Sequence, residues 1–196
     1  MSINVIVDHL SVVVAAICLT LVFGLPCGIL AYFNKTFKVV IFKITDVLQT
    51  IPSLALLGII MIFLGGNKLT VVVGLFLYSL LPVVRNTYTG LSGIDPAVKE
   101  AAKGMGMGKL YQLIHVELPI AFPVIFTGIR IAVINQISAA VFGTFVGGGL
   151  GTVIYRGMAN MNMKLILFGT VSLMIMAVFF DTLMGFIEKR LYARTR

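Results

Sequence analysis

The sequence predicts an all-α fold, an integral membrane helical bundle, and three observations support this prediction. Hydrophobic residues make up 59% of the 196 residues, the mean hydropathy is +1.08, and only 11% of the residues are charged. A soluble domain of this length would need a more polar surface than these residues can supply. No polar segment is long enough to enclose a core of its own, so we expect one transmembrane domain over residues 1–196.

Five apolar runs predict five transmembrane helices. The first covers residues 10–33 and has no charged residue over 24 positions, enough to cross a hydrocarbon core about 30 Å thick. The other four cover residues 44–64, 69–84, 120–146 and 165–187. The second run carries Asp46 close to its start and Pro52 in its interior. The N-terminal stretch has no basic segment, so we expect no cleaved signal peptide.

The distribution of Lys and Arg predicts the orientation. Eleven of the 15 basic residues fall on one side of the expected spans: Lys35, Lys38, Lys43, Arg85, Lys99, Lys103, Lys109, Lys189, Arg190, Arg194 and Arg196. Three fall on the other side, and Arg130 lies inside a span. Because cytoplasmic loops are enriched in basic residues, we expect the N-terminus outside a cell membrane and the C-terminus in the cytoplasm. The net charge of +8 reflects this bias, so we expect no nucleic-acid partner.

The sequence contains no pattern typical of an enzyme or a metal site. Cys18 and Cys27 lie nine residues apart on one expected helix, roughly 13 Å along it, too far apart for a disulfide. His9 and His115 have no ligands at metal-binding spacing, and we find no Walker motif or nucleophile–base pattern. We therefore expect a subunit without catalytic residues, bound metal or bound cofactor.

One long polar segment, residues 95–118, lies between the third and fourth expected spans. Asp95 can cap a helix that starts at Pro96. Three glycines follow at alternate positions: Gly104, Gly106 and Gly108. They permit positive φ angles and a tight reversal, after which a helical pattern resumes up to Pro119. The segment predicts two short helices at a bend on the cytoplasmic face.

The residues of this segment allow three interpretations. A glycine-rich loop can bind phosphate, but this one lacks the preceding strand and the Lys-Ser/Thr pair of a nucleotide loop. The segment can also lie on the membrane surface as a loop helix, or it can dock into a soluble partner.

The segment resembles the EAA loop of ABC importer permeases, whose pattern is E-A-A-x3-G-x9-I-x-L-P. Seven residues carry the pattern at its spacing: Glu100, Ala101, Ala102, Gly106, Val116, Leu118 and Pro119. Val116 in place of Ile is the one departure. The stretches IPSLALLG, LYSLLPVVRNTYTGL and FVGGGLG resemble the permeases of osmoprotectant importers for glycine betaine, carnitine and choline. Those permeases have a five-span fold similar to that of the methionine importer permease.

The resemblance implies a subunit that forms the translocation pathway together with a second permease, either a copy of this chain or a paralogue. The loop would sit in a cleft of a cytoplasmic ABC ATPase subunit, which would carry the ATP and Mg, and an external substrate-binding protein would deliver the substrate. Glu100 would hold the loop or face the ATPase, Ala101 and Ala102 would allow close approach, and Gly106 would make the turn.

Two other functions remain open from the sequence. An ABC importer for an amino acid or a metal chelate can use the same scaffold, and only the resemblance favours osmoprotectants. An ion-driven secondary carrier should show a network of carboxylates in the middle of its spans. Asp46 and Asp181 both lie close to the expected cytoplasmic end and do not supply such a network.

Polar and aromatic residues inside the spans are candidates for the pathway or the bundle interior. A cation inside a membrane is costly unless it is paired or hydrated, so Arg130 should face the bundle, the pathway or a subunit interface. Asn135 and Gln136 can bond between helices or line a passage. Tyr78 and Phe142 could face a quaternary ammonium group, although ordinary packing competes with this role for each ring.

Four glycines follow the fourth span on the external side: Gly147, Gly148, Gly149 and Gly151. Irregular backbone at membrane depth is tolerated only where protein or water covers it. We expect a re-entrant loop that acts as an external gate, with an exposed surface loop as the alternative.

Overall fold

The computed structural model describes residues 3–146 and 148–194, and within these ranges the chain forms helices and no strand. The main helices are α1 (Ile3–Phe33), α2 (Lys35–Thr50), α3 (Ser53–Leu64), α4 (Lys68–Ser92), α5 (Pro96–Gly104), α6 (Lys109–Gln112), α7 (Leu118–Ala139), α8 (Gly149–Ala159) and α9 (Met163–Arg194). A π-helical turn, η1 (Leu113–Glu117), joins α6 to α7, and a 3₁₀ helix, η2 (Ala140–Val146), follows α7. The all-α membrane bundle is confirmed.

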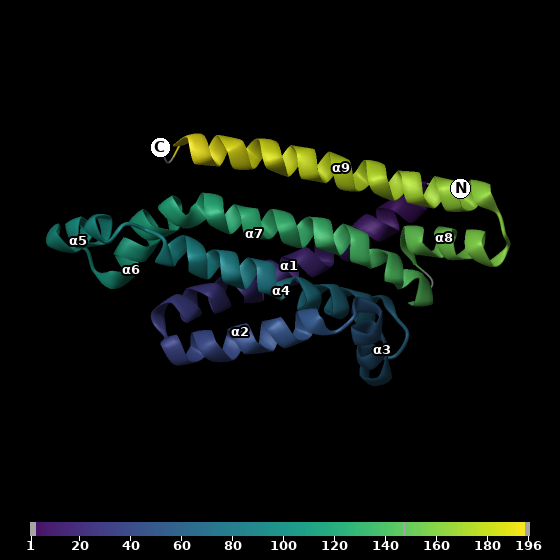
Figure 1. The fold of residues 1–196 in the computed structure, drawn as a ribbon, viewed down its shortest axis with the longest axis horizontal. Coiled ribbons are helices and arrows are strands. Elements are labelled where there is room, and N and C mark those ends of the chain that lie inside the picture. The colour runs from purple at the N-terminus through teal and green to yellow at the C-terminus, as the bar shows by residue number, and fades with distance from the viewer. Residues whose placement is uncertain (1–2, 147, 195–196) are drawn as a thin grey trace.

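The long helices lie along the long axis of the molecule (Figure 1). Helices α5 and α6 project at one end, where the C-terminal end of α9 also lies, and we call this the α5 end. Helix α8 and the start of α1 lie at the opposite end, which we call the α8 end. The predicted ATPase-coupling loop, residues 95–118, and the predicted external gate, which leads into α8, therefore lie at opposite ends of one bundle.

Among the residues that the structure describes, four helical stretches are long and apolar enough to cross a membrane. They are Asn4–Phe33, Lys68–Ser92, Lys109–Thr144 and Met163–Ala193. The pair α2 and α3 passes the same test jointly and would make a fifth span, but its two helices meet at an angle of 103°. The exposed side of α9 is almost entirely apolar, with Leu167, Val171, Met174, Ile175 and Val178 more than 40% exposed, as expected of a helix that faces lipid.

The break between α2 and α3 differs from the single span predicted for residues 44–64. Ile51 leaves the helical region with φ −72° and ψ 126°, and Pro52 precedes the first residue of α3. Proline lacks a backbone N–H and disfavours helical angles in the residue before it, so the chain turns at this position. Helix α2 also begins earlier than expected, at Lys35, so Asp46 lies eleven residues into it rather than close to its start.

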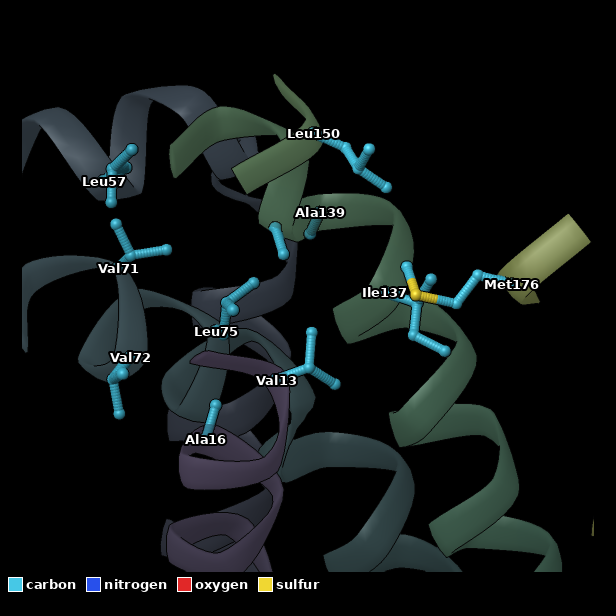
Figure 2. Packing of buried hydrophobic residues seen from close by; sticks show 11 residues of the cluster. Val13, Ala16, Leu57, Val71, Val72, Leu75, Ile137, Ala139, Leu150 and Met176 are labelled. Atoms are coloured by element: carbon cyan, nitrogen blue, oxygen red, sulfur yellow. The ribbon is translucent and has the colours of Figure 1, made fainter. Parts of the chain in front are cut away.

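The core lies toward the α8 end, where six helices and η2 meet (Figure 2). Its members come from α1 (Val13, Ala16), α3 (Leu57), α4 (Val71, Val72, Leu75), α7 (Ile137, Ala139), η2 (Ala140), α8 (Leu150) and α9 (Met176). A smaller apolar cluster of Leu91, Ile94, Leu113, Ala121 and Ile125 lies toward the α5 end, below the projecting loop. Each candidate functional segment is thus attached to its own packed cluster.

Candidate functional site

The loop over residues 95–118 begins as its residues predict. The Asp95 carboxylate accepts a hydrogen bond from the Ala97 N–H at 2.9 Å, and Pro96 occupies the first position of α5. This cap satisfies one of the free N–H groups of the first turn. Helix α5 is nine residues long and ends at Gly104.

The end of α5 is a Schellman motif centred on Gly106. The Gly106 N–H donates to the Lys103 carbonyl at 3.0 Å, and the Met107 N–H donates to the Ala102 carbonyl at 3.2 Å. Gly106 has φ +79°, a left-handed angle that favours glycine. The other two glycines do not need this freedom: Gly104 is the last residue of α5, and Gly108 has φ −67°. Of the three glycines, only Gly106 is required by the backbone.

The second short helix expected in the loop is not a separate element. Helix α6 passes through η1 into α7, and the Leu118 N–H bonds the Leu113 carbonyl five residues back. Pro119 has no N–H, so the α-helical bond to the carbonyl of His115 cannot form, and the wider π turn accommodates this gap. Residues 109–144 therefore form one continuous helical stretch from the loop to the opposite end of the bundle.

The motif residues of the loop divide into exposed and buried positions. Glu100, Ala101 and Pro119 are exposed, Leu118 is half-buried, and Ala102 is only 2% exposed. Within the described part of the chain Glu100 makes no hydrogen bond or ion pair. Large apolar side chains nearby are also exposed: Met105, Leu110, Tyr111 and Ile114. The loop thus presents an apolar surface with a free carboxylate at its edge, as a docking surface requires.

Two polar contacts fix the base of the loop, and the sequence did not indicate them. The Lys99 ammonium donates to the Leu91 carbonyl at 2.9 Å and lies 4.9 Å from the centre of the Tyr32 ring. Glu117 is only 5% exposed and accepts a hydrogen bond from the Gln112 amide at 2.8 Å. The Lys99 contacts hold α5 against α4 and α1, whereas the bond between Gln112 and Glu117 joins α6 to η1.

Arg130 is paired with two carboxylates of α9. Its Nε and Nη2 donate to Asp181 Oδ1 at 2.9 and 2.7 Å, and its Nη1 donates to Glu188 Oε2 at 2.6 Å. The Thr127 hydroxyl donates to the other oxygen of Glu188. Asp181 and Glu188 lie seven residues apart and therefore share one face of α9. The cation inside the span is compensated by an ion-pair network that joins α7 to α9.

The two polar neighbours of Arg130 in the sequence have different surroundings. Asn135 lines an open cavity of about 350 Å³ together with Arg130 and Asp181. Gln136 is fully buried and donates to the Thr20 hydroxyl of α1 at 3.0 Å. Asn135 is thus accessible from a cavity, whereas Gln136 bonds two helices inside the bundle.

Tyr78 and Phe142 line one small cavity between α3, α4 and η2. Its volume is about 20 Å³, room for about one water molecule. The lining also includes Ser53, Leu57 and Ala139, and none of the lining residues is charged. The two candidate aromatic residues are therefore neighbours in space, although 64 positions separate them in the sequence.

Gly148 and Gly149, which we call the glycine turn, pack on α1 where α8 begins. Gly147 lies outside the described residues. The Gly149 N–H donates to Asp8 Oδ2 at 3.2 Å, and Gly149 starts α8 with φ +71°. Gly151 is buried so closely that an added Cβ would lie 1.8 Å from the Val141 carbonyl oxygen. From Gly149 onward the segment forms a short helix, α8.

Three further polar contacts join residues that are far apart in the sequence, and no sequence pattern indicates them. Asp46 of α2 binds Arg85 of α4 at 2.7 and 2.9 Å, and Lys38 donates to the Tyr88 hydroxyl at 2.8 Å. Arg85, expected in a loop, is seven residues inside the end of α4. At the α8 end, Asp8 pairs with Lys68. In the described ranges we find no group of three or more His, Cys, Asp or Glu side chains that could hold a metal ion.

The structure is thus a multi-pass helical membrane bundle with a structured, apolar loop at one end, an arrangement that suits a transport permease. The chain matches the family described as "Binding-protein-dependent transport system inner membrane component" over residues 10–193, and it belongs to this family.

Known relatives and a solved structure agree with this assignment. The chain is 43% identical over 185 residues to the glycine betaine/carnitine/choline transport system permease protein OpuCD of Bacillus subtilis, covering 93% of this chain and 81% of that protein. It is 45% identical over 172 residues to the choline transport system permease protein OpuBD of the same organism, covering 87% and 76%. It is also similar in fold to a chain of the MetNI methionine ABC transporter, with a TM-score of 0.82, 22% identity, and coverage of 93% and 92%.

Proposed function

We propose that this chain is the permease subunit of an ATP-driven importer for quaternary-ammonium osmoprotectants such as glycine betaine, carnitine and choline. The observation that carries the proposal is the loop over residues 95–118, whose Schellman turn at Gly106 exposes an apolar docking surface at one end of the bundle. The substrate class rests on the names of the relatives, which at 35–45% identity are permeases for glycine betaine, carnitine or choline. This chain carries no ATP site of its own in the proposal, and ATP and Mg are bound by the partner ATPase.

The continuous helical stretch suggests how the loop acts on the pathway. An ATPase subunit that binds the loop contacts α6 directly, and η1 and α7 extend from α6 without a break. Helix α7 carries Arg130 in its middle and leads through η2 to the glycine turn at the α8 end. Movement of the docked loop is therefore transmitted to both regions by a rigid body rather than by a flexible linker.

The proposal fixes an orientation and a set of partners. The α5 end lies in the cytoplasm and the α8 end outside, since eleven of the 15 basic residues fall on the predicted cytoplasmic side. A second permease, either this chain or a paralogue, completes the pathway in a prokaryotic cell membrane, and an external substrate-binding protein docks at the α8 end. The glycines Gly148, Gly149 and Gly151 belong to the external gate.

Two sites are proposed for the substrate path. The rings of Tyr78 and Phe142 serve as a weak passage site once the cavity between them, which has room for about one water molecule in this structure, widens during transport, because a quaternary ammonium prefers aromatic faces. The second proposed substrate site is the cavity lined by Arg130 and Asn135, which lies between α7 and α9. An amino-acid importer on the same scaffold is the less favoured function, because the similarity to the methionine transporter, at 22% identity, concerns the fold alone.

The test is uptake by the complete transporter in vesicles. The chain is purified with the ATPase, second permease and binding protein that accompany it, and uptake of labelled glycine betaine, carnitine, choline and methionine is measured with and without ATP. The proposal expects ATP-dependent uptake of at least one quaternary-ammonium compound and none of methionine. Uptake in the absence of the ATPase would contradict an ABC importer, and a preference for methionine would contradict the substrate class.

A further inference from the structure

Two adjacent residues of α1 connect four helices at the α8 end. The carboxylate of Asp8 pairs through Oδ1 with the ammonium of Lys68, the first residue of α4. Its Oδ2 accepts a hydrogen bond from the N–H of Gly149, the first residue of α8. His9 Nε2 donates to the Ile137 carbonyl in the last turn of α7 at 3.1 Å. Breaking the Asp8 contacts would remove these polar contacts of α1 with α4 and α8 while leaving its hydrogen bond to α7.

Asp8 supplies a helix cap that α8 lacks within its own sequence. Gly148 is the residue before α8 and makes no side-chain cap. The first N–H groups of a helix have no partner inside the helix and carry a partial positive charge. The Asp8 carboxylate satisfies one of them from another helix and also neutralises Lys68. Moving α8 away from α1 would thus leave the N-terminus of α8 uncapped, while Lys68 of α4 would stay paired with Asp8.

The glycine turn fits tightly on these two residues. A Cβ added to Gly148 would lie 3.0 Å from Asp8 Oδ2, and one added to Gly149 would lie 2.9 Å from His9 Nδ1. The absence of side chains at both positions lets the backbone of α8 reach the carboxylate. Gly148 and Gly149 therefore pack directly on Asp8 and His9 of α1.

The boundary between α1 and α8 is the weaker side of α8. Helix α8 packs mainly on α9 and η2 and contacts α1 less extensively. An open cavity of about 360 Å³, lined by Asn4, Asp8, Thr152 and Arg156, enters this boundary. A second cavity, lined by Asp8, Val12 and Val146, lies on the inner side of the same contact. If α8 moves with α9 and η2 as one unit, the hydrogen bond between Asp8 and Gly149 must break.

We infer that Asp8 is a positioning residue that holds the external gate closed, that Lys68 orients its carboxylate, and that its contact with Gly149 breaks when the transporter opens outward. The inference rests on the proposed function, which makes the α8 end external. It assigns to Asp8 a part in the transport cycle that differs from the coupling loop and from the substrate sites.

The test measures access to the inner side of this contact. In a chain with Cys18→Ala and Cys27→Ala, a single reporter cysteine, Val12→Cys, faces the inner cavity. The complete transporter in vesicles is labelled from outside with a charged, membrane-impermeant thiol reagent. We expect Asp8→Ala to raise the labelling rate about tenfold, which corresponds to about 1.4 kcal/mol. Asp8→Asn should give a smaller increase, since its amide oxygen can still accept from the Gly149 N–H.

A nucleotide comparison separates a gate from a general loss of stability. In the parent, trapping the complex with ATP should raise the labelling rate, whereas in Asp8→Ala the rate is already high and should change little. Asp46→Ala is the matched control, because it removes a carboxylate from another partly exposed ion pair between two helices, the one with Arg85. Its labelling rate should equal that of the parent. Equal rates in Asp8→Ala, Asp8→Asn and the parent would overturn the inference.

Two further outcomes keep the conclusions distinct. If Asp8→Ala fails to fold, Lys68→Gln retains the α8 cap and tests the ion pair alone, and it should also speed labelling. If the labelling results are as expected but the complex transports a different solute class, the role of Asp8 stands and the proposed substrate fails. If uptake is as proposed but the Asp8 and Lys68 variants are labelled at the same rate as the parent, only the role of Asp8 is overturned.

Discussion

Arg130 of α7 is held by Asp181 of α9 through two guanidinium nitrogens, at 2.7 and 2.9 Å, while a third binds Glu188. This network joins the helix that extends from the loop to the last helix of the bundle. Its two carboxylates outnumber the one guanidinium, so the Thr127 hydroxyl that donates to Glu188 contributes to its stability. The planar fork of arginine matches this arrangement, and an ammonium does not.

We expect Arg130→Lys to destabilise the protein despite the retained charge. Lysine cannot reach both carboxylates with the same geometry, and the loss of one or two charge-assisted hydrogen bonds costs about 1–3 kcal/mol. Thermal unfolding of the purified complex should show a lower midpoint for Arg130→Lys and a still lower one for Arg130→Gln. A midpoint equal to that of the parent in both variants would show that the network contributes nothing to stability.

Substitution of Gly106 should uncouple ATP hydrolysis from transport. Gly106→Ala places a Cβ at φ +79° and costs about 1–2 kcal/mol, and Gly106→Leu adds bulk to the same strained residue. We expect the ratio of uptake to ATP hydrolysis to fall in both variants, more strongly for Leu. Unchanged uptake and ATPase rates in Gly106→Leu would contradict a coupling role.

The neighbouring glycines provide matched controls for this prediction. A Cβ added at Gly104, Gly106 or Gly108 meets no atom within 4 Å, so the three positions differ chiefly in backbone angle. Gly104→Ala and Gly108→Ala should therefore leave coupling unchanged. Gly106→Asn should retain more activity than Gly106→Ala, because asparagine tolerates the left-handed region.

The local features of the loop could be predicted because short-range chemistry determines them. The Asp95 cap, the position of Pro96 and the turn at Gly106 each depend on residues within a few positions of one another. The continuity of α6 with α7 could not be predicted in the same way. Proline at position 119 suggests a helix start, and only the π turn before it allows the helix to continue backwards.

The long-range contacts were beyond the reach of sequence patterns. Arg130 was recognised as a cation that needs partners, but those partners lie 51 and 58 positions away on α9. Asp46 and Arg85 were assigned to the ends of spans, because apolar runs mark the hydrophobic stretch and not the full helix. No pattern in the sequence marks Asp8, because its partners Lys68 and Gly149 are brought to it only by the packing of three helices.

The two alanines of the loop should respond differently to the same substitution. Ala102 is 2% exposed, so Ala102→Leu should overpack the loop and lower the unfolding midpoint, at a cost of about 1–3 kcal/mol. Ala101 is exposed, so Ala101→Leu should leave the midpoint unchanged and weaken only the binding of the ATPase subunit. Thermal unfolding of the permease and co-purification of the ATPase measure the two effects separately. If both variants still bound the ATPase subunit normally, this result would argue against docking at this surface.

Tyr78 and Phe142 test whether the aromatic cavity contacts the substrate. Replacing one ring removes a cation–π contact of about 0.5–2 kcal/mol, so we expect Tyr78→Leu and Phe142→Leu to reduce uptake of a quaternary-ammonium compound about two- to thirtyfold. Tyr78→Phe keeps the ring face and should transport like the parent. Phe179→Leu is the matched control, because Phe179 is 60% exposed on the apolar face of α9. If Phe179→Leu reduced uptake as much as Phe142→Leu, the effect would come from general destabilisation, and a normal rate in both cavity variants would exclude this cavity from the substrate path.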